Sequence, residues 1–225
     1  TTITDEAVLH QIKLRNGINK ALRRLQYVMA NDPAPVNGLD VINTVYGSGF
    51  DINTEGLEDR INAVTDKIEK EYTEGKNIGK KPRILATGSP SGGAALKVIR
   101  AIEDNGGVVV CFENCTGMKP LAMVDEENPD VYDALARKYL NIGCSCMSPN
   151  KNRLDLLDEL IDDFQVDGVV DLVLQACHTY NVETALIKKL VKDKKGIPYT
   201  VVETDYSQAD IEQINTRMAA FIEML

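Results

Sequence analysis

The sequence has no tryptophan and few other aromatic residues, which together make up 5% of its 225 residues. This scarcity argues against a protein that binds nucleic-acid bases or sugars by stacking. No apolar run approaches the roughly 18 residues that a membrane helix needs, and the N-terminus lacks the basic and then apolar pattern of a secretory signal. We therefore expect a soluble, cytoplasmic protein that does not bind membranes.

Basic residues are also outnumbered, because 25 Lys and Arg stand against 34 Asp and Glu and leave a net charge of −9. A field of that sign repels phosphate backbones, so nucleic acid is not an expected partner. The hydrophobic share of 44% is enough to bury a core of one or two domains. The chain begins with Thr1 and has no methionine before Met29, which we interpret as a piece of a longer protein.

Residues 1–81 are predicted to form a helical segment. Thr4 is a typical N-cap for a first helix that stops before Pro33, and a second amphipathic helix has apolar residues at 57, 61, 64 and 68. Residues 37–50 between them are predicted to be a glycine-punctuated connector, and residues 74–81 a polar linker. This segment is expected to precede a separate α/β domain.

Residues 82–225 alternate short β-rich runs with helical periods, which is typical of βαβ units around a buried parallel sheet. Strands are predicted at 83–87, 107–112, 168–174 and 199–203. Helices are predicted at 94–104, 130–141, 153–164, 182–193 and 208–224, the last of them capped by Ser207. The predicted fold class is thus α/β, with a four-stranded, doubly wound, flavodoxin-like or Rossmann-like sheet preceded by the helical segment.

Five cysteines, all beyond residue 100, are the most informative feature of the sequence. An odd number without an export signal is poor material for disulfides and better material for thiolate chemistry or metal binding. They are Cys111, Cys115, Cys144, Cys146 and Cys177. They follow predicted strands or occupy a Gly- and Pro-flanked turn, so we expect them at the sheet edge where ligands of open α/β folds bind.

Two interpretations of these cysteines compete. A single cysteine often packs as a small hydrophobe, which for Cys111 after three valines is as plausible as ligation. Packing explains the pair Cys144 and Cys146 less well, because a polar turn offers little apolar contact. Thiolates select zinc, copper(I) or iron–sulfur clusters, and the irregular spacing fits an iron–sulfur cluster better than paired zinc knuckles.

Polar residues at the same strand ends are candidates for a supporting role. His178 could donate a hydrogen bond to a cluster sulfur or serve as a ligand, whereas Gln175, Glu113, Glu203 and Asp205 could tune the cluster potential or handle protons. Each also has an ordinary interpretation as a satisfied polar residue or a helix-start acid. The sequence assigns no catalytic residue.

The glycine-rich stretch 87–97 follows the first strand and opens a helix, the context of a phosphate-binding loop. Gly88 and Gly93 have Walker spacing, but Ala94 and Ala95 stand where the lysine and the hydroxyl residue are required. We favour a tight turn over a nucleotide site.

These motifs carry a family resemblance. Glu-Asn-Cys-Thr-Gly, Ile-Gly-Cys-Ser-Cys-Met-Ser-Pro-Asn, Leu-Gln-Ala-Cys-His-Thr-Tyr-Asn-Val-Glu and Val-Glu-Thr-Asp-Tyr-Ser resemble the 2-hydroxyacyl-CoA dehydratase and benzoyl-CoA reductase superfamily, nearest to its double-cubane cluster branch. The resemblance implies an iron–sulfur enzyme that receives low-potential electrons from an ATP-hydrolysing activator of the acetate and sugar kinase type. It implies a small-molecule or acyl-CoA substrate, and homodimers are common in the family.

The resemblance also sets the expected ligands. All five cysteines match cysteines of the double-cubane branch, in which six hold the cluster pair, so this chain is one short. Relatives have a further N-terminal domain, which implies that this chain is a C-terminal fragment with an incomplete or absent cluster and no activity alone. Two alternatives stay open: a dehydratase subunit with a single four-iron cluster, and a non-catalytic zinc-binding module.

Overall fold

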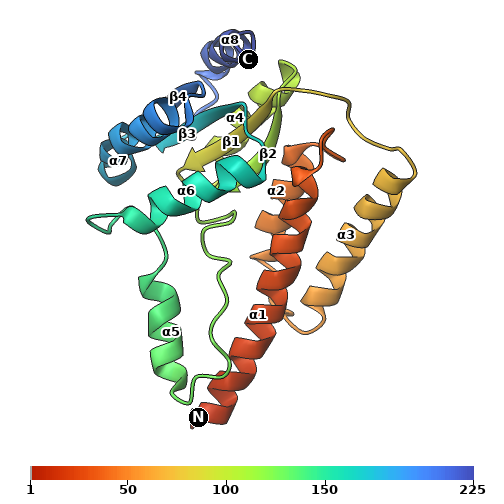
Figure 1. The fold of residues 1–225 in the computed structure, drawn as a ribbon, viewed down its shortest axis with the longest axis vertical. Coiled ribbons are helices and arrows are strands. Elements are labelled where there is room, and N and C mark those ends of the chain that lie inside the picture. The colour runs from red at the N-terminus through yellow and green to blue at the C-terminus, as the bar shows by residue number, and fades with distance from the viewer. Residues whose placement is uncertain (1) are drawn as a thin grey trace.

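Two long helices form the N-terminal part of the computed structural model, which describes residues 2–225. Helix α1 spans Asp5–Tyr27, and its N-cap is Thr4, whose hydroxyl accepts a hydrogen bond from the Ala7 amide at 3.3 Å. A 3₁₀ turn, η1 (Val28–Ala30), ends the helix before Pro33, as predicted. Helix α3 (Leu57–Thr73) runs beside α1 (Figure 1).

The predicted connector at 37–50 is wrong, because Gly38–Ser48 forms a helix, α2. No side chain of its own caps this helix; the Glu103 carboxylate accepts hydrogen bonds from the amides of Gly38 at 2.6 Å and Leu39 at 3.3 Å. A Cβ atom on Gly38 would stand 2.0 Å from the Val109 carbonyl oxygen, so α2 packs directly on the neighbouring strand. The capping carboxylate and the strand on which α2 packs therefore both lie far from this helix in the sequence.

The sheet consists of four parallel strands, which confirms the predicted α/β class. The strands are β1 (Arg83–Gly88), β2 (Val108–Glu113), β3 (Gly168–Leu174) and β4 (Tyr199–Thr204), in the order β2-β1-β3-β4. All residues of β1 and β2 are buried. Strand order reverses between β1 and β3, the place where open α/β sheets form their ligand crevice.

Helices cover both faces of the sheet (Figure 1). They are α4 (Ala94–Asp104), α5 (Val131–Leu140), α6 (Lys151–Asp163), α7 (His178–Lys189) with its π-helical extension η2 (Leu190–Lys195), and α8 (Ile211–Ile222). Helix α4 packs against α8 on one face, whereas α6 and α7 contact β2 and β3 from the other. Helix α5 extends away from the sheet toward the N-terminal end of α1.

Helix α8 begins later than predicted, because its N-cap is Asp210 and not Ser207. The Asp210 carboxylate forms an ion pair with Lys97 and accepts a hydrogen bond from the Thr204 hydroxyl at 2.6 Å. The Ser207 amide instead donates to the side chain of Asp205 at 2.7 Å, which closes a turn. These contacts from α4 and β4 set the start of the helix.

One hydrophobic core connects the helical segment to the sheet, from Ile18 in α1 to Phe221 in α8. The division at residues 81 and 82 stays a prediction. Within residues 2–225, no helix combines the length and the apolar character that a membrane crossing requires.

Candidate functional site

Four of the five cysteines lie on loops around the carboxyl edge of the sheet. Cys115 follows β2, Cys144 and Cys146 lie in the turn that leads into α6, and Cys177 is the N-cap residue of α7. Cys115 and Cys146 are exposed, and Cys144 and Cys177 are partly exposed. All are free thiols, so each is available for ligation or chemistry.

Cys144 and Cys146 form a close pair, with 3.4 Å between their Sγ atoms. The backbone amide of Cys146 and then its thiol donate toward Cys144 and lower the pKa of Cys144, with a smaller contribution from the charge of Lys119. The same thiol–thiol hydrogen bond raises the pKa of Cys146. This hydrogen bond therefore shifts the two pKa values in opposite directions, and a lowered thiol pKa favours binding of a soft metal.

Cys111 is set apart from the other four. It lies within β2, is 1% exposed and belongs to the hydrophobic core. Burial raises the pKa of its thiol well above the ordinary value, since the charged form is poorly solvated there. The structure therefore supports the packing interpretation that the sequence left open for this residue.

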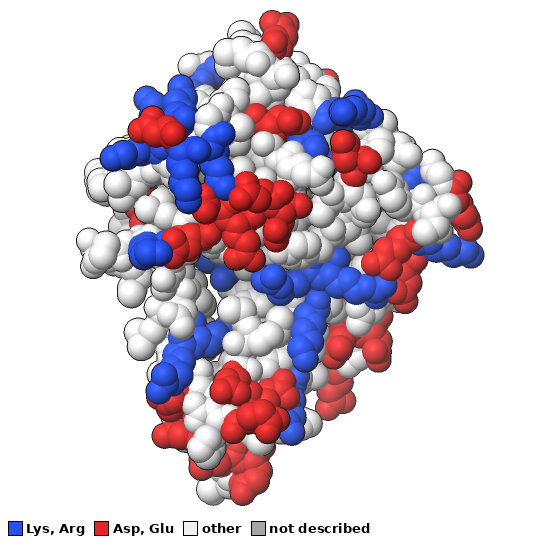
Figure 2. All heavy atoms as spheres, viewed as in Figure 1, with Lys and Arg blue, Asp and Glu red and all other residues white. Residues whose placement is uncertain are grey.

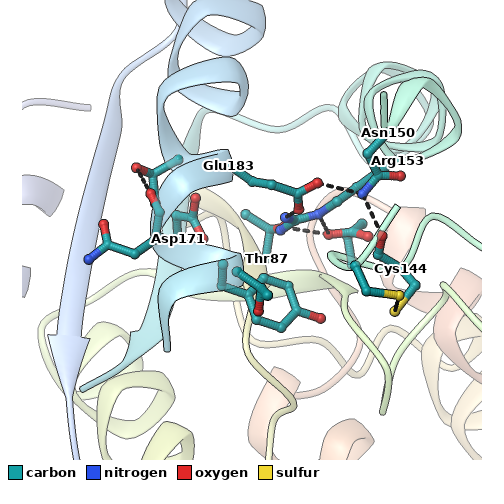
Figure 3. Close-up of polar contacts among 12 residues, drawn as sticks. Thr87, Cys144, Asn150, Arg153, Asp171 and Glu183 are labelled. Carbon is teal, nitrogen blue, oxygen red and sulfur yellow. Dashed lines mark hydrogen bonds and ion pairs between the residues drawn. The ribbon is translucent and has the colours of Figure 1, made fainter. Parts of the chain in front are cut away.

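A buried ionic network lies beneath the cysteine loops, centred on Arg153 of α6 (Figure 3). The guanidinium is 1% exposed and forms ion pairs with Glu183 of α7 and, at 3.3 Å, with Glu113 at the end of β2. It also donates to the Thr87 hydroxyl at 2.9 Å, which in turn donates to Glu113. Lys119 adds a second buried cation, 3.1 Å from Glu113.

This network contacts two of the cysteine loops. Asn150 donates to the Cys144 carbonyl oxygen at 2.9 Å and to Glu183 at 2.6 Å, so it ties the Cys144 turn to the carboxylate that Arg153 binds (Figure 3). The Tyr180 ring lies 4.9 Å from the Arg153 guanidinium carbon, and its hydroxyl is 3.6 Å from the Cys115 Sγ atom. The buried ionic network therefore fixes the positions of the loops that carry Cys115 and Cys144.

Sequence reasoning missed most of this network. A signal for Arg153 was present, because it shares the buried face of α6 with Leu157 and Leu160, four and seven residues further along the helix. An arginine in such a register must meet carboxylates inside the protein. Asp171 in the middle of the apolar strand β3 is a second such signal.

Asp171 is the least compensated carboxylate of the site. One of its oxygens accepts a hydrogen bond from the Tyr199 hydroxyl at 2.8 Å, and the other has no hydrogen-bond partner within residues 2–225. Burial raises the pKa of Asp171 to about 6, against the attraction of Arg153. The folded protein therefore holds this proton more tightly than the unfolded chain does.

This pKa predicts how stability responds to pH. Since the folded pKa lies above the unfolded value, the free energy of unfolding falls as pH rises from about 4 to about 6 and stays lower above that range. Asp171→Asn removes this loss, and we expect it to stabilise the protein at pH 7 by up to about 3 kcal/mol, with little effect at pH 4. Urea unfolding at both pH values measures this, and equal effects at both would contradict it.

The predicted supporting residues have different environments. Glu113 is fully buried in the ionic network, whereas His178, at the start of α7, is exposed. Gln175 and Glu203 are exposed and line an acidic hollow of about 260 Å³ with Asp205 and Asp210, in which no cysteine takes part. The structure therefore brings Gln175 and Glu203 together in this hollow, with Gln175 two residues before Cys177.

The glycine-rich stretch forms a tight turn against β3. Gly88 has φ +98°, and a Cβ atom there would stand 2.1 Å from the Leu172 carbonyl oxygen. Close packing between strands explains this glycine, in agreement with the turn interpretation. Ala176, with φ +65°, is a non-glycine residue in the same left-handed region directly before Cys177, and such backbone conformations collect at functional sites.

The donor chemistry of the loops fits an iron–sulfur group. Four accessible thiols surround one sheet edge, and two of them already stand side by side. Within residues 2–225, no three His, Cys, Asp or Glu side chains converge as the ligands of a single metal ion do. Thiolates are ligands of iron–sulfur clusters and also of zinc, so these cysteines could hold either group.

Comparisons with known proteins agree on one family. The model of the family described as 2-hydroxyglutaryl-CoA dehydratase, D-component, matches residues 1–225. The chain is 48% identical, over 99% of its length, to the "Putative dehydratase subunit YjiM" of Escherichia coli strain K12. It is 23% identical over 99% of its length to the (R)-phenyllactyl-CoA dehydratase beta subunit of Clostridium sporogenes, and 22% identical over 68% to a benzoyl-CoA reductase subunit of Thauera aromatica.

These relatives are longer than the chain. The matched region spans 58% of the first two and 36% of the third.

Proposed function

Because the chain belongs to the 2-hydroxyglutaryl-CoA dehydratase D-component family, we propose that it is an iron–sulfur component of an enzyme that reduces or dehydrates a small substrate. Such a cluster supplies single low-potential electrons when bound. The observation that carries the proposal is the set of four accessible cysteines around one edge of the sheet, in a chain of this family.

The proposed ligands are Cys115, Cys144, Cys146 and Cys177. They come from three separate loops, a pattern that iron–sulfur proteins accept. Cys111 is left out because its burial in the core keeps its thiol neutral and distant from solvent. A double-cubane cluster is the first proposal, and a single four-iron cluster, as in a dehydratase subunit, is the second.

The residues beneath the loops have a positioning role in this proposal. Asn150 and Tyr180 hold the Cys144 turn and the Cys115 loop through Arg153 and Glu183. Among the four thiols, the positive charge of Lys119 contributes to the lowered pKa of Cys144. The electron donor we propose is an ATP-hydrolysing activator of the acetate and sugar kinase type.

The test is the iron and acid-labile sulfide per chain after strictly anaerobic reconstitution, with YjiM treated in parallel. In each protein we expect iron and sulfide in equal amounts. We expect less of each in this chain, because its four proposed ligands are fewer than the six cysteines of the double-cubane branch. Close to eight irons in YjiM supports the double cubane, and close to four supports a single cluster. Equimolar zinc with raised thermal stability supports a zinc module instead, and no metal in either protein contradicts the proposal.

A further inference from the structure

A cavity of about 440 Å³ lies beside the loop that carries Cys115. Helices α1 and α2, the Cys115 loop and the end of α5 surround it. Its volume is within the range of ligand pockets, about 300–1,000 Å³. Apolar side chains form much of the wall, namely Leu22, Val45, Phe50 and Leu121.

Two cations line the same cavity. Lys138, near the end of α5, is 8% exposed, and its ammonium group forms no ion pair or hydrogen bond with any residue from 2 to 225. Its nitrogen lies 5.0 Å from the centroid of the Tyr139 ring, which is only a weak cation–π contact. Arg15 of α1, whose side chain is exposed, also lines the cavity and forms no ion pair within residues 2–225. Burial, and then the charge of Arg15, lower the pKa of Lys138, so the two positive charges repel one another with no protein carboxylate between them.

The surface around the cavity agrees with this charge pattern. On the face drawn in Figure 2, basic side chains lie along α1 and over α5, whereas acidic side chains gather over α6 and at the lower end of the molecule. A second, smaller cavity of about 240 Å³ also has Arg15 and Lys138 in its wall, so the two cations stand between two hollows.

Helix geometry accounts for only part of this arrangement. A lysine in the last turn of a helix is favoured by the dipole, and its aliphatic stem can cover apolar surface. That explanation does not account for the low exposure of the Lys138 side chain, nor for Arg15 as a second cation in the same wall. A largely buried lysine side chain beside a second cation, with no carboxylate paired to either, favours an anion that occupies the cavity.

We propose that this cavity binds a small carboxylate with an apolar body, whose carboxylate lies between Arg15 and Lys138. Its apolar part contacts Leu22, Val45 and Leu121, and it reaches the wall formed by Cys115 and Thr116. The inference rests on the proposed function where it takes this molecule to be the substrate. The binding site itself depends only on the cavity and the two cations.

Calorimetric titration of the metal-free chain with hexanoate tests the proposal. Hexanamide has the same shape without the charge, and acetate has the charge without the apolar body. We expect hexanoate to bind at least about tenfold more tightly than either, because a hydrogen bond to a charged group contributes about 1.5–3 kcal/mol. Hexanamide binding as tightly as hexanoate would overturn the proposal, and so would no binding of hexanoate.

Three variants assign the site. Lys138→Met is expected to weaken hexanoate binding at least about tenfold, and Lys138→Arg to retain most of it. Lys20→Met, on an exposed position of α1 outside the cavity, changes net charge equally and is expected to leave affinity unchanged. Equal losses in Lys20→Met and Lys138→Met would contradict a specific site. Circular dichroism confirms that each variant is folded.

Failure of this inference is separable from failure of the proposed function. Binding is measured without metal, and iron content is measured without hexanoate. Normal iron content with no hexanoate binding rejects the anion site alone, and hexanoate binding with no iron in this chain or YjiM rejects the cluster alone.

Discussion

Arg153→Met is expected to lower the free energy of unfolding by about 3–5 kcal/mol, the usual cost of removing one partner from a buried ion pair. The guanidinium is 1% exposed and faces the carboxylates of Glu183 and Glu113. Methionine fills much of the same volume but leaves Glu183 buried without a cation. Lys119 still pairs with Glu113, so the loss is concentrated on the α7 side of the network.

Urea unfolding followed by far-ultraviolet circular dichroism measures this loss. Arg137→Met is the matched control, because Arg137 forms an ion pair with Asp133 on the surface of α5 and its side chain is 72% exposed. We expect that control to change stability by at most about 0.5 kcal/mol. Similar small effects in both variants would show that the network contributes little to the fold.

The double substitution Cys144→Ser and Cys146→Ser is expected to reduce the iron and sulfide retained after anaerobic reconstitution at least about tenfold. Even changes to the partners of a metal ligand alter affinity by about 10–100-fold, and this variant removes two ligands themselves. The two Sγ atoms are 3.4 Å apart on an accessible turn, so serine replaces the thiols without creating a cavity. Iron and labile sulfide per chain are the readout.

Cys111→Ala is the matched cysteine control. Its thiol is buried in β2 and lies within the core, so we expect iron and sulfide per chain to stay unchanged while stability falls slightly. Loss of iron in Cys111→Ala equal to that in the double variant would return Cys111 to the ligand set. Unchanged iron in the double variant would show that Cys144 and Cys146 are not ligands.

Much of the fold could be predicted from local pattern. The four strands and the helices at 94–104 and 131–140 agree with the predicted ranges to within one or two residues, because buried parallel strands produce short continuous apolar runs. Local pattern does not predict helix α2, because its cap is Glu103 on another helix. It favours Ser207 as the cap of α8, because the pairing of Asp210 with Lys97 has no signature in the sequence.

The residues of the candidate site also divide into those that the sequence predicts and those that only the tertiary structure reveals. The sequence by itself determined the family, the α/β class, the cysteines and the loops on which four of them lie, since these depend on residue type and on neighbours along the chain. Only the tertiary structure separated Cys111 from the others, and only it assembled Arg153, Glu113 and Glu183, which are 30 to 70 residues apart in the chain. Burial and charge pairing are properties of positions in space, so they became visible when the strands and helices had come together.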